Sequence, residues 1–182
     1  MRSMPSLAKE TFTRRLCADA LMLCAALMLS YLEAILPIHL ILPLPGFRFG
    51  WAQLAVTLVF FRVGRADAAI VSLCRVFMMG LLFGSATTLY FSLCGAVLSY
   101  VGLWIGHIAL RPRCSFIGLG VLCAALHNIG QLIAAATLFG SGIVMAYLPV
   151  LLISSIVFGG LGGWVLNVCA DRIPMLRGGV TA

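Results

Sequence analysis

Arg75 is the residue whose position in this sequence most needs a chemical explanation. It lies within Asp67–Ser85, an otherwise apolar segment long enough to form a membrane-spanning helix. An arginine at the centre of a bilayer costs about 2.5–3.5 kcal/mol on insertion scales, so we expect its side chain to face protein or a water-filled cavity. Its guanidinium offers paired donors that suit a carboxylate or phosphate of a ligand. A structural ion pair with Glu33 or with a helix end is the alternative interpretation.

A second polar group lies in a later apolar segment. His127 and Gln131 are four residues apart and share one face of a helix, with Asn128 beside them. One interpretation is that these residues only fix helix packing, where each hydrogen bond is worth about 0.6 kcal/mol in membranes. We favour the other, that they line a polar cavity with Arg75, because clustered polar groups at similar depth cost more than packing requires.

Three further residues are candidates for the same cavity. Glu33 lies in the last turn of the first apolar run, and Gln53 lies near the outer end of the second. Between them, Pro37–Gly50 contains three prolines yet is apolar, so we expect a turn-rich lid at the membrane interface. Glu33 and Arg48 flank this segment and would latch it if they pair, although an exposed pair contributes little.

The composition places the chain in the membrane class. Of its 182 residues, 63% are hydrophobic and 9% are charged, against roughly 45–50% and 25% in soluble domains. A soluble core cannot hide so much apolar surface, whereas lipid receives it directly. We therefore expect an all-α, polytopic membrane protein with six transmembrane helices. They would cover residues 16–36, 51–61, 67–85, 86–110, 115–139 and 143–169, the second being short for a full crossing.

The basic residues predict the orientation. On one side they number four in residues 1–15 and two each in residues 62–65, 111–113 and 170–182, whereas the other side receives only Arg48. Cytoplasmic loops hold the excess of Lys and Arg, so both termini should be cytoplasmic. The expected organisation is a basic cytoplasmic arm at 1–15, a six-helix membrane domain at 16–169 and a cytoplasmic tail at 170–182. Because the net charge of +7 is spread between the spans, it does not indicate nucleic-acid binding.

Small residues predict where helices touch. Gly95, Ser99, Gly102 and Gly106 form a stripe in the fourth run, and Gly159-x-x-x-Gly163 lies in the sixth. Such residues let membrane helices approach closely. We expect both sets to be contact surfaces, within this chain or, for the second set, with a partner protein.

Motifs for catalysis are not found. The five acidic residues are isolated, so no carboxylate cluster could hold magnesium on a diphosphate. There is no P-loop, no G-x-S-x-G and no His/Cys metal spacing, and the seven cysteines suit helix packing. The sequence predicts no catalytic residue, metal or cofactor. Active transport would need a partner that supplies energy.

Three stretches together are typical of one bacterial family. They are Pro45–Gly50 with Gln53, then Arg75 followed by Gly80-Leu81-Leu82-Phe83-Gly84-Ser85, and His127-Asn128-Ile129-Gly130-Gln131-Leu132. On these the chain resembles the heptaprenyl diphosphate synthase component I family, also called the Gx transporter family, over about residues 16–168. Family members usually carry asparagine at the position of Gln53 and often lysine at that of Arg48.

That family is similar to the S components of energy-coupling factor transporters, which are six-helix membrane proteins that bind a nutrient near the outer face. The resemblance implies a substrate-binding subunit in the bacterial cytoplasmic membrane, surrounded by lipid, that docks on a transmembrane subunit with ATPases. Its solute pocket would use Arg75, His127, Asn128 and Gln131.

The family's enzyme name implies an alternative. The chain would then be a non-catalytic membrane subunit that serves a soluble prenyltransferase in menaquinone and isoprenoid synthesis, since the aspartate-rich motif is absent here. A third interpretation is an assembly factor without a ligand, in which Arg75 is only structural.

Overall fold

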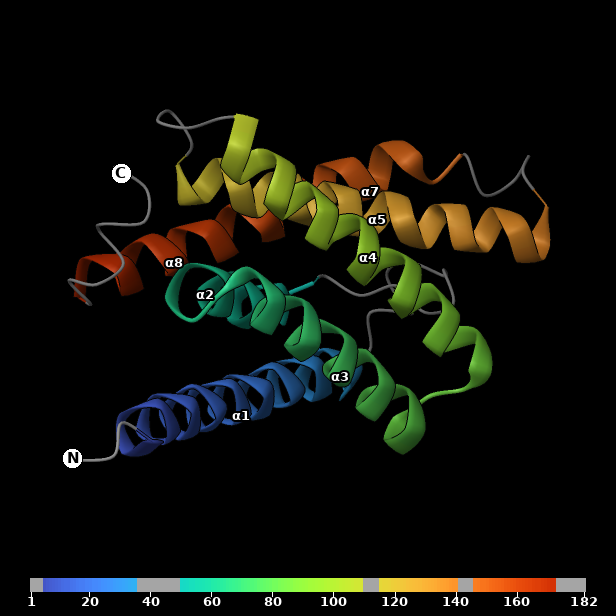
Figure 1. Cartoon of the computed structure of the whole chain (residues 1–182). Helices are drawn as coiled ribbons and strands as arrows, with labels where there is room; N and C mark the ends of the chain where they lie inside the picture. The colour runs from blue at the N-terminus through green and yellow to red at the C-terminus, as the bar shows by residue number, and fades with distance from the viewer. Residues whose placement is uncertain (1–4, 36–49, 110–114, 141–145, 173–182) are drawn as a thin grey trace.

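A computed structural model of the chain describes residues 5–35, 50–109, 115–140 and 146–172, and these residues form helices and short connections without strands (Figure 1). The helices are α1 (Pro5–Ile35), α2 (Gln53–Arg62), α3 (Arg65–Phe83), α4 (Ala86–Ala109), α5 (Phe116–Phe139), α7 (Leu148–Ser154) and α8 (Gly160–Arg172). The π-helical turn η2 (Ser155–Gly159) joins α7 to α8. The predicted all-α class is confirmed for the described residues. Arg48 and most of the predicted lid lie outside them.

Five continuous helical segments of the described residues are long and apolar enough to cross a membrane, the last being α7, η2 and most of α8 together. They cover Phe12–Ile35, Arg65–Phe83, Ala86–Ala109, Phe116–Phe139 and Leu148–Cys169. The second predicted span instead forms the 10-residue helix α2, about 15 Å long at 1.5 Å per residue. The hydrocarbon core is about 30 Å thick, so α2 alone does not cross it. The chain is a multi-pass membrane protein with five described helical segments of spanning length, where the sequence predicted six.

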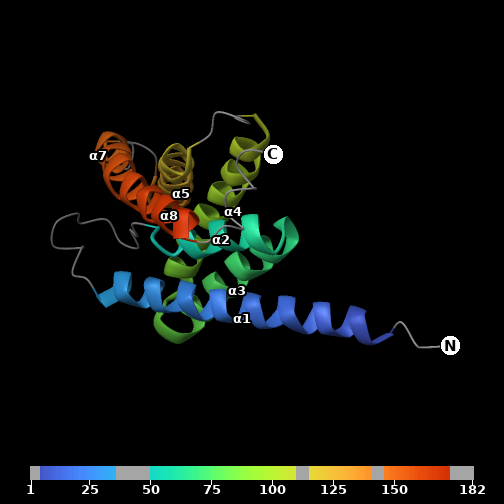
Figure 2. The ribbon, with the colours of Figure 1, turned by 90° about the vertical axis from the view of Figure 1, so that its left-hand side faces the viewer.

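Helix α2 occupies the centre of the molecule. It lies between α1 on one side and α5 with α8 on the other (Figure 1), and the end-on view agrees (Figure 2). Val56 and Val59 of α2 are fully buried in a core cluster that includes Val71 of α3, Leu103 of α4 and Leu119 of α5. A short helix is stable at membrane depth here because protein surrounds it.

Glycines bring α4, α5 and α8 into backbone contact, as the small-residue pattern predicts. A Cβ at Gly130 of α5 would lie 2.6 Å from the Cys94 carbonyl oxygen of α4. A Cβ at Gly163 of α8 would lie 2.4 Å from Ile117 Cα. The Gly159-x-x-x-Gly163 surface is therefore used within the chain, where it packs on α5.

The basic helix ends gather at one end of the bundle. The start of α1, the α2–α3 connection, the start of α5 and the end of α8 all lie on the left in Figure 1. Arg15 of α1 forms an ion pair of 2.7 Å with Asp67 in the first turn of α3. Helix α1 begins at Pro5, so much of the predicted arm is a continuation of the first span.

Candidate functional site

Arg75 points into the protein from α3. Its side chain is only 4% exposed, and Nη1 donates a hydrogen bond of 3.3 Å to the Ser30 hydroxyl of α1. The same face of α3 buries Val71, Ser72 and Val76, whereas Ile70 and Phe77 are exposed. The arginine is thus shielded from lipid, as its cost in a bilayer predicts.

Glu33 lies three residues after Ser30 on the same face of α1 and is also buried. Its Oε1 accepts a hydrogen bond from the backbone N–H of Trp51, just before α2 begins. The first N–H groups of a helix have no partner within the helix, and its N-terminus favours negative charge. The carboxylate therefore fixes the start of α2 against the end of α1.

His127 lies on the other side of this α2 start. A Cβ at Gly50 would be 3.8 Å from His127 Cδ2, and Gly50 has a φ of +82°, which favours glycine. The imidazole Nε2 lies 3.3 Å from Gln131 Nε2 one turn later on α5. This contact orients the imidazole along the face of α5 that carries both residues.

These contacts form two sets of buried polar groups, Ser30 with Arg75 and the groups around the Gly50–Trp51 backbone, and the shared face of Ser30 and Glu33 on α1 links them. We call the two sets together the polar layer, and it consists of Ser30, Glu33, Arg75, His127, Gln131 and the backbone of Gly50–Trp51. Helix α3 packs mainly on α1, α2 and α4, whereas α5 packs mainly on α4, η2 and α8. The α2 start joins the two halves of the layer.

Asn128 points in a different direction from its neighbour His127. Its Nδ2 donates to the Leu151 carbonyl (3.1 Å) and to the Ser155 hydroxyl (2.8 Å), where α7 gives way to η2. Its Oδ1 is buried and has no hydrogen-bond partner among the described residues. The amide nitrogen therefore holds α7 on α5, while the oxygen stays a candidate ligand group.

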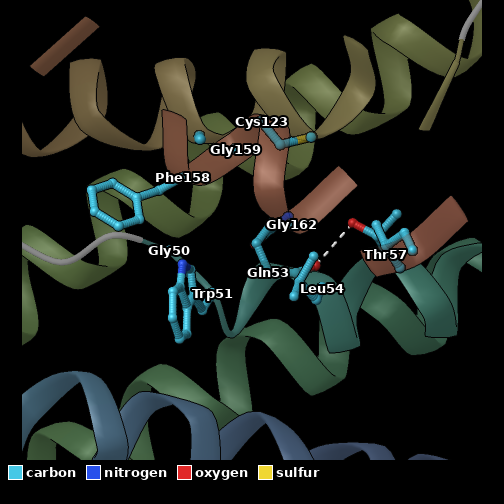
Figure 3. A pocket seen from close by; sticks show the side chains of 12 residues that line it. Gly50, Trp51, Gln53, Leu54, Thr57, Cys123, Phe158, Gly159 and Gly162 are labelled. Carbon is cyan, nitrogen blue, oxygen red and sulfur yellow. Dashed lines mark hydrogen bonds between the residues drawn. The ribbon is translucent and has the colours of Figure 1, made fainter. Parts of the chain in front are cut away.

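Gln53 borders a small cavity between α2, α5, η2 and α8 (Figure 3). The cavity has a volume of about 20 Å³. Gln53 is 6% exposed, and its backbone carbonyl accepts a hydrogen bond of 2.8 Å from Thr57, drawn as the dashed line in Figure 3. The remaining lining is Gly50, Trp51, Leu54, Gly120, Cys123, Ala124, Phe158, Gly159, Gly162 and Leu166.

The structure brings five of the predicted site residues to the polar layer or its border, namely Glu33, Gln53, Arg75, His127 and Gln131. Sequence reasoning missed Ser30 and Trp51. The spacing of Ser30 and Glu33 on one face of a span was a usable signal for Ser30. Trp51 gave none, because it contributes a backbone N–H. Within the described ranges, no three His, Cys, Asp or Glu side chains could hold a metal ion.

The chemistry of the layer suits the binding of a polar ligand. It offers a guanidinium, a carboxylate, an imidazole and a neutral amide, all shielded from lipid. Paired donors on Arg75 match an anionic group, and Gln131 and His127 match uncharged polar groups.

Comparison with known proteins gave one finding. A family model described as heptaprenyl diphosphate synthase component I matches residues 22–169. No curated protein and no solved structure matches the chain. The matched range contains every residue of the polar layer and the Gln53 cavity.

Proposed function

Since the chain belongs to the heptaprenyl diphosphate synthase component I family, we propose that it binds a small solute inside the membrane, as the substrate-binding subunit of an uptake transporter. One observation carries this proposal. Arg75 is 4% exposed in a membrane-spanning helix and lies in one layer with Glu33, His127 and Gln131. Ionisable groups at membrane depth are costly, and by default they mark ligand or ion pathways.

The position of the layer supports a site near the outer face. Glu33 lies in the last turn of α1, far along the helix from Arg15. Arg15, Arg62 and Arg65 mark the other end of the bundle, which is the cytoplasmic end because cytoplasmic segments hold the excess of basic residues. Both termini are then cytoplasmic. In this proposal the membrane is the bacterial cytoplasmic membrane, and α2 is an element inside it that is too short to cross it alone.

The solute ligands in this proposal are Arg75 for an anionic group and His127, Gln131, Gln53 and Asn128 Oδ1 for neutral groups. Glu33 holds the α2 start, and Arg48 lies on the segment that leads to it. The sequence contains no ATP-binding motif. Active uptake therefore requires a partner, namely a transmembrane energy-coupling subunit with ATPases.

The printed family description favours a second candidate function. A component I implies a partner subunit in heptaprenyl diphosphate synthase. In this case the chain is a non-catalytic membrane subunit that anchors a soluble prenyltransferase through its cytoplasmic end, and the polar layer is structural.

Native mass spectrometry in mild detergent tests the proposal. We compare wild type with Arg75→Ala, and with Arg62→Ala as a matched control that removes an exposed arginine at the cytoplasmic end. The proposal predicts a small bound molecule that Arg62→Ala retains and that Arg75→Ala loses while its helical circular dichroism is unchanged. An empty wild type that carries a soluble prenyltransferase instead would refute solute binding and favour the second function.

A further inference from the structure

Three buried polar atoms at the Gln53 cavity lack hydrogen-bond partners among the described residues. They are Gln53 Oε1, Gln53 Nε2 and Trp51 Nε1. Both residues line the cavity, and their side chains appear beside it in Figure 3. Buried polar groups in proteins are nearly always paired with protein or with ordered water. These three atoms can therefore form hydrogen bonds with an occupant of the cavity.

The size of the cavity limits that occupant to one heavy atom with its hydrogens. A water molecule needs about 10–15 Å³ of such volume, and this cavity offers about 20 Å³. The cavity therefore has room for a water molecule or for one small projecting group.

The chemistry of the lining defines the occupant further. Trp51 Nε1 and Gln53 Nε2 can only donate, whereas Gln53 Oε1 can only accept. The occupant must therefore both accept and donate, which a hydroxyl or a water molecule does. Leu54, Ala124 and Leu166 surround it, so a charged group would be buried without compensation.

The cavity adjoins the polar layer. Gly50 lines the cavity and also lies against His127, and the Trp51 backbone donates to Glu33. A solute in the layer is thus separated from the cavity only by the Gly50–Trp51 segment and its side chains.

We propose that the Gln53 cavity is a subsite for one uncharged hydroxyl-type group. Water occupies it in the solute-free protein, and a hydroxyl of the solute replaces that water on binding. This inference rests on the proposed function, and it adds that the solute is an alcohol.

The occupant can be detected by NMR with water as the probe. The sample is the protein in detergent with ¹⁵N-labelled tryptophan and glutamine, and Arg75→Ala provides the solute-free form. A long-lived water cross-peak is expected at the Trp51 indole. Trp104 and Trp164 are half-exposed on the outer face of the bundle and are internal controls. Absence of the cross-peak in solute-free protein overturns the subsite.

Substitution of Gln53 tests the hydrogen-bonding role. Gln53→Met preserves the length of the side chain without its amide, so it should lose the cross-peak and lower the affinity for the molecule seen by native mass spectrometry about tenfold. Gln53→Asn keeps an amide and should retain both the cross-peak and the affinity. It tests the role of the amide if Gln53→Met does not fold.

The NMR experiment also distinguishes water from a solute hydroxyl as the occupant of the cavity. In wild type with its bound molecule, the water cross-peak should disappear, because the solute hydroxyl takes its place. A cross-peak that persists in the loaded protein refutes the alcohol assignment but leaves solute binding intact. Solute binding itself fails only if the Arg75→Ala comparison fails, so the two failures can be distinguished.

Discussion

Gly95→Ala is expected to disturb the polar layer by moving His127. A Cβ at Gly95 would lie 2.8 Å from His127 Cε1, 2.9 Å from Nδ1 and 3.0 Å from the His127 backbone oxygen. The ring is buried, and Gln131 holds its Nε2. Because one of the three close atoms belongs to the α5 backbone, rotation of the imidazole does not relieve the clash. Helix α5 must shift away from α4.

The magnitude follows from comparison with Gly118→Ala on α5. A glycine in a helix interior is less stable than alanine by roughly 0.5–1 kcal/mol. Gly95 lies in the interior of α4 and gains this on substitution, whereas Gly118 lies in the first turn of α5 and gains at most as much. A Cβ at Gly118 meets only the Ser115 hydroxyl oxygen at 3.4 Å, so that variant has no serious clash. Forcing a methyl group into a packed core costs about 1–3 kcal/mol. Gly95→Ala should therefore be less stable than Gly118→Ala by about 1–3 kcal/mol.

The assay is SDS-induced unfolding in mixed micelles, followed by circular dichroism, for both variants and wild type. Gly118→Ala should match or exceed the stability of wild type. Gly95→Ala should unfold at lower SDS and retain less of any bound molecule, because His127 has moved. Equal stability of the two alanine variants would refute the inferred α4–α5 contact.

Two further substitutions test contacts of α5. Asn128→Ala removes the donor to Leu151 and Ser155. It should lower the free energy of unfolding by about 1 kcal/mol, measured by the same SDS titration. Unchanged stability would contradict the role of Asn128 in holding α7. Ser115→Ala removes the N-cap acceptor of the Gly118 N–H (3.0 Å) and should lower the free energy of unfolding by about 1 kcal/mol. Ser115→Asp keeps a capping acceptor and should preserve stability. Equal losses of stability in the two variants would rule out capping.

Predictions about individual helices succeeded where the physical cause is local. A window of about 20 apolar residues suits a bilayer wherever the rest of the chain lies, so the spans around Arg75 and His127 could be placed closely. The sequence also predicted that the Arg75 side chain points inward, because lipid disfavours its charge on any exposed face. The glycine stripe of the fourth run predicted a close contact, although not which helix would fill it.

The predictions that depended on helix partners were less complete. The second apolar run was counted as a span, yet α2 has 10 residues and is buried at the centre of the molecule. Protein on all sides removes the need to match the membrane thickness. Asn128 was grouped with His127 and Gln131, but its amide nitrogen bonds Leu151 and Ser155 instead.

The sequence by itself determined that the chain is a helical membrane protein, that five of its segments are long and apolar enough to cross a bilayer, and that Arg75 must be shielded. Each of these depends on transfer of a short segment from water to lipid, which is a local property. Only the tertiary structure decided that Ser30 is a partner of Arg75 across 45 residues, and that Glu33 anchors the start of α2. Such pairs depend on which helix faces dock, and many distant side chains set that packing together.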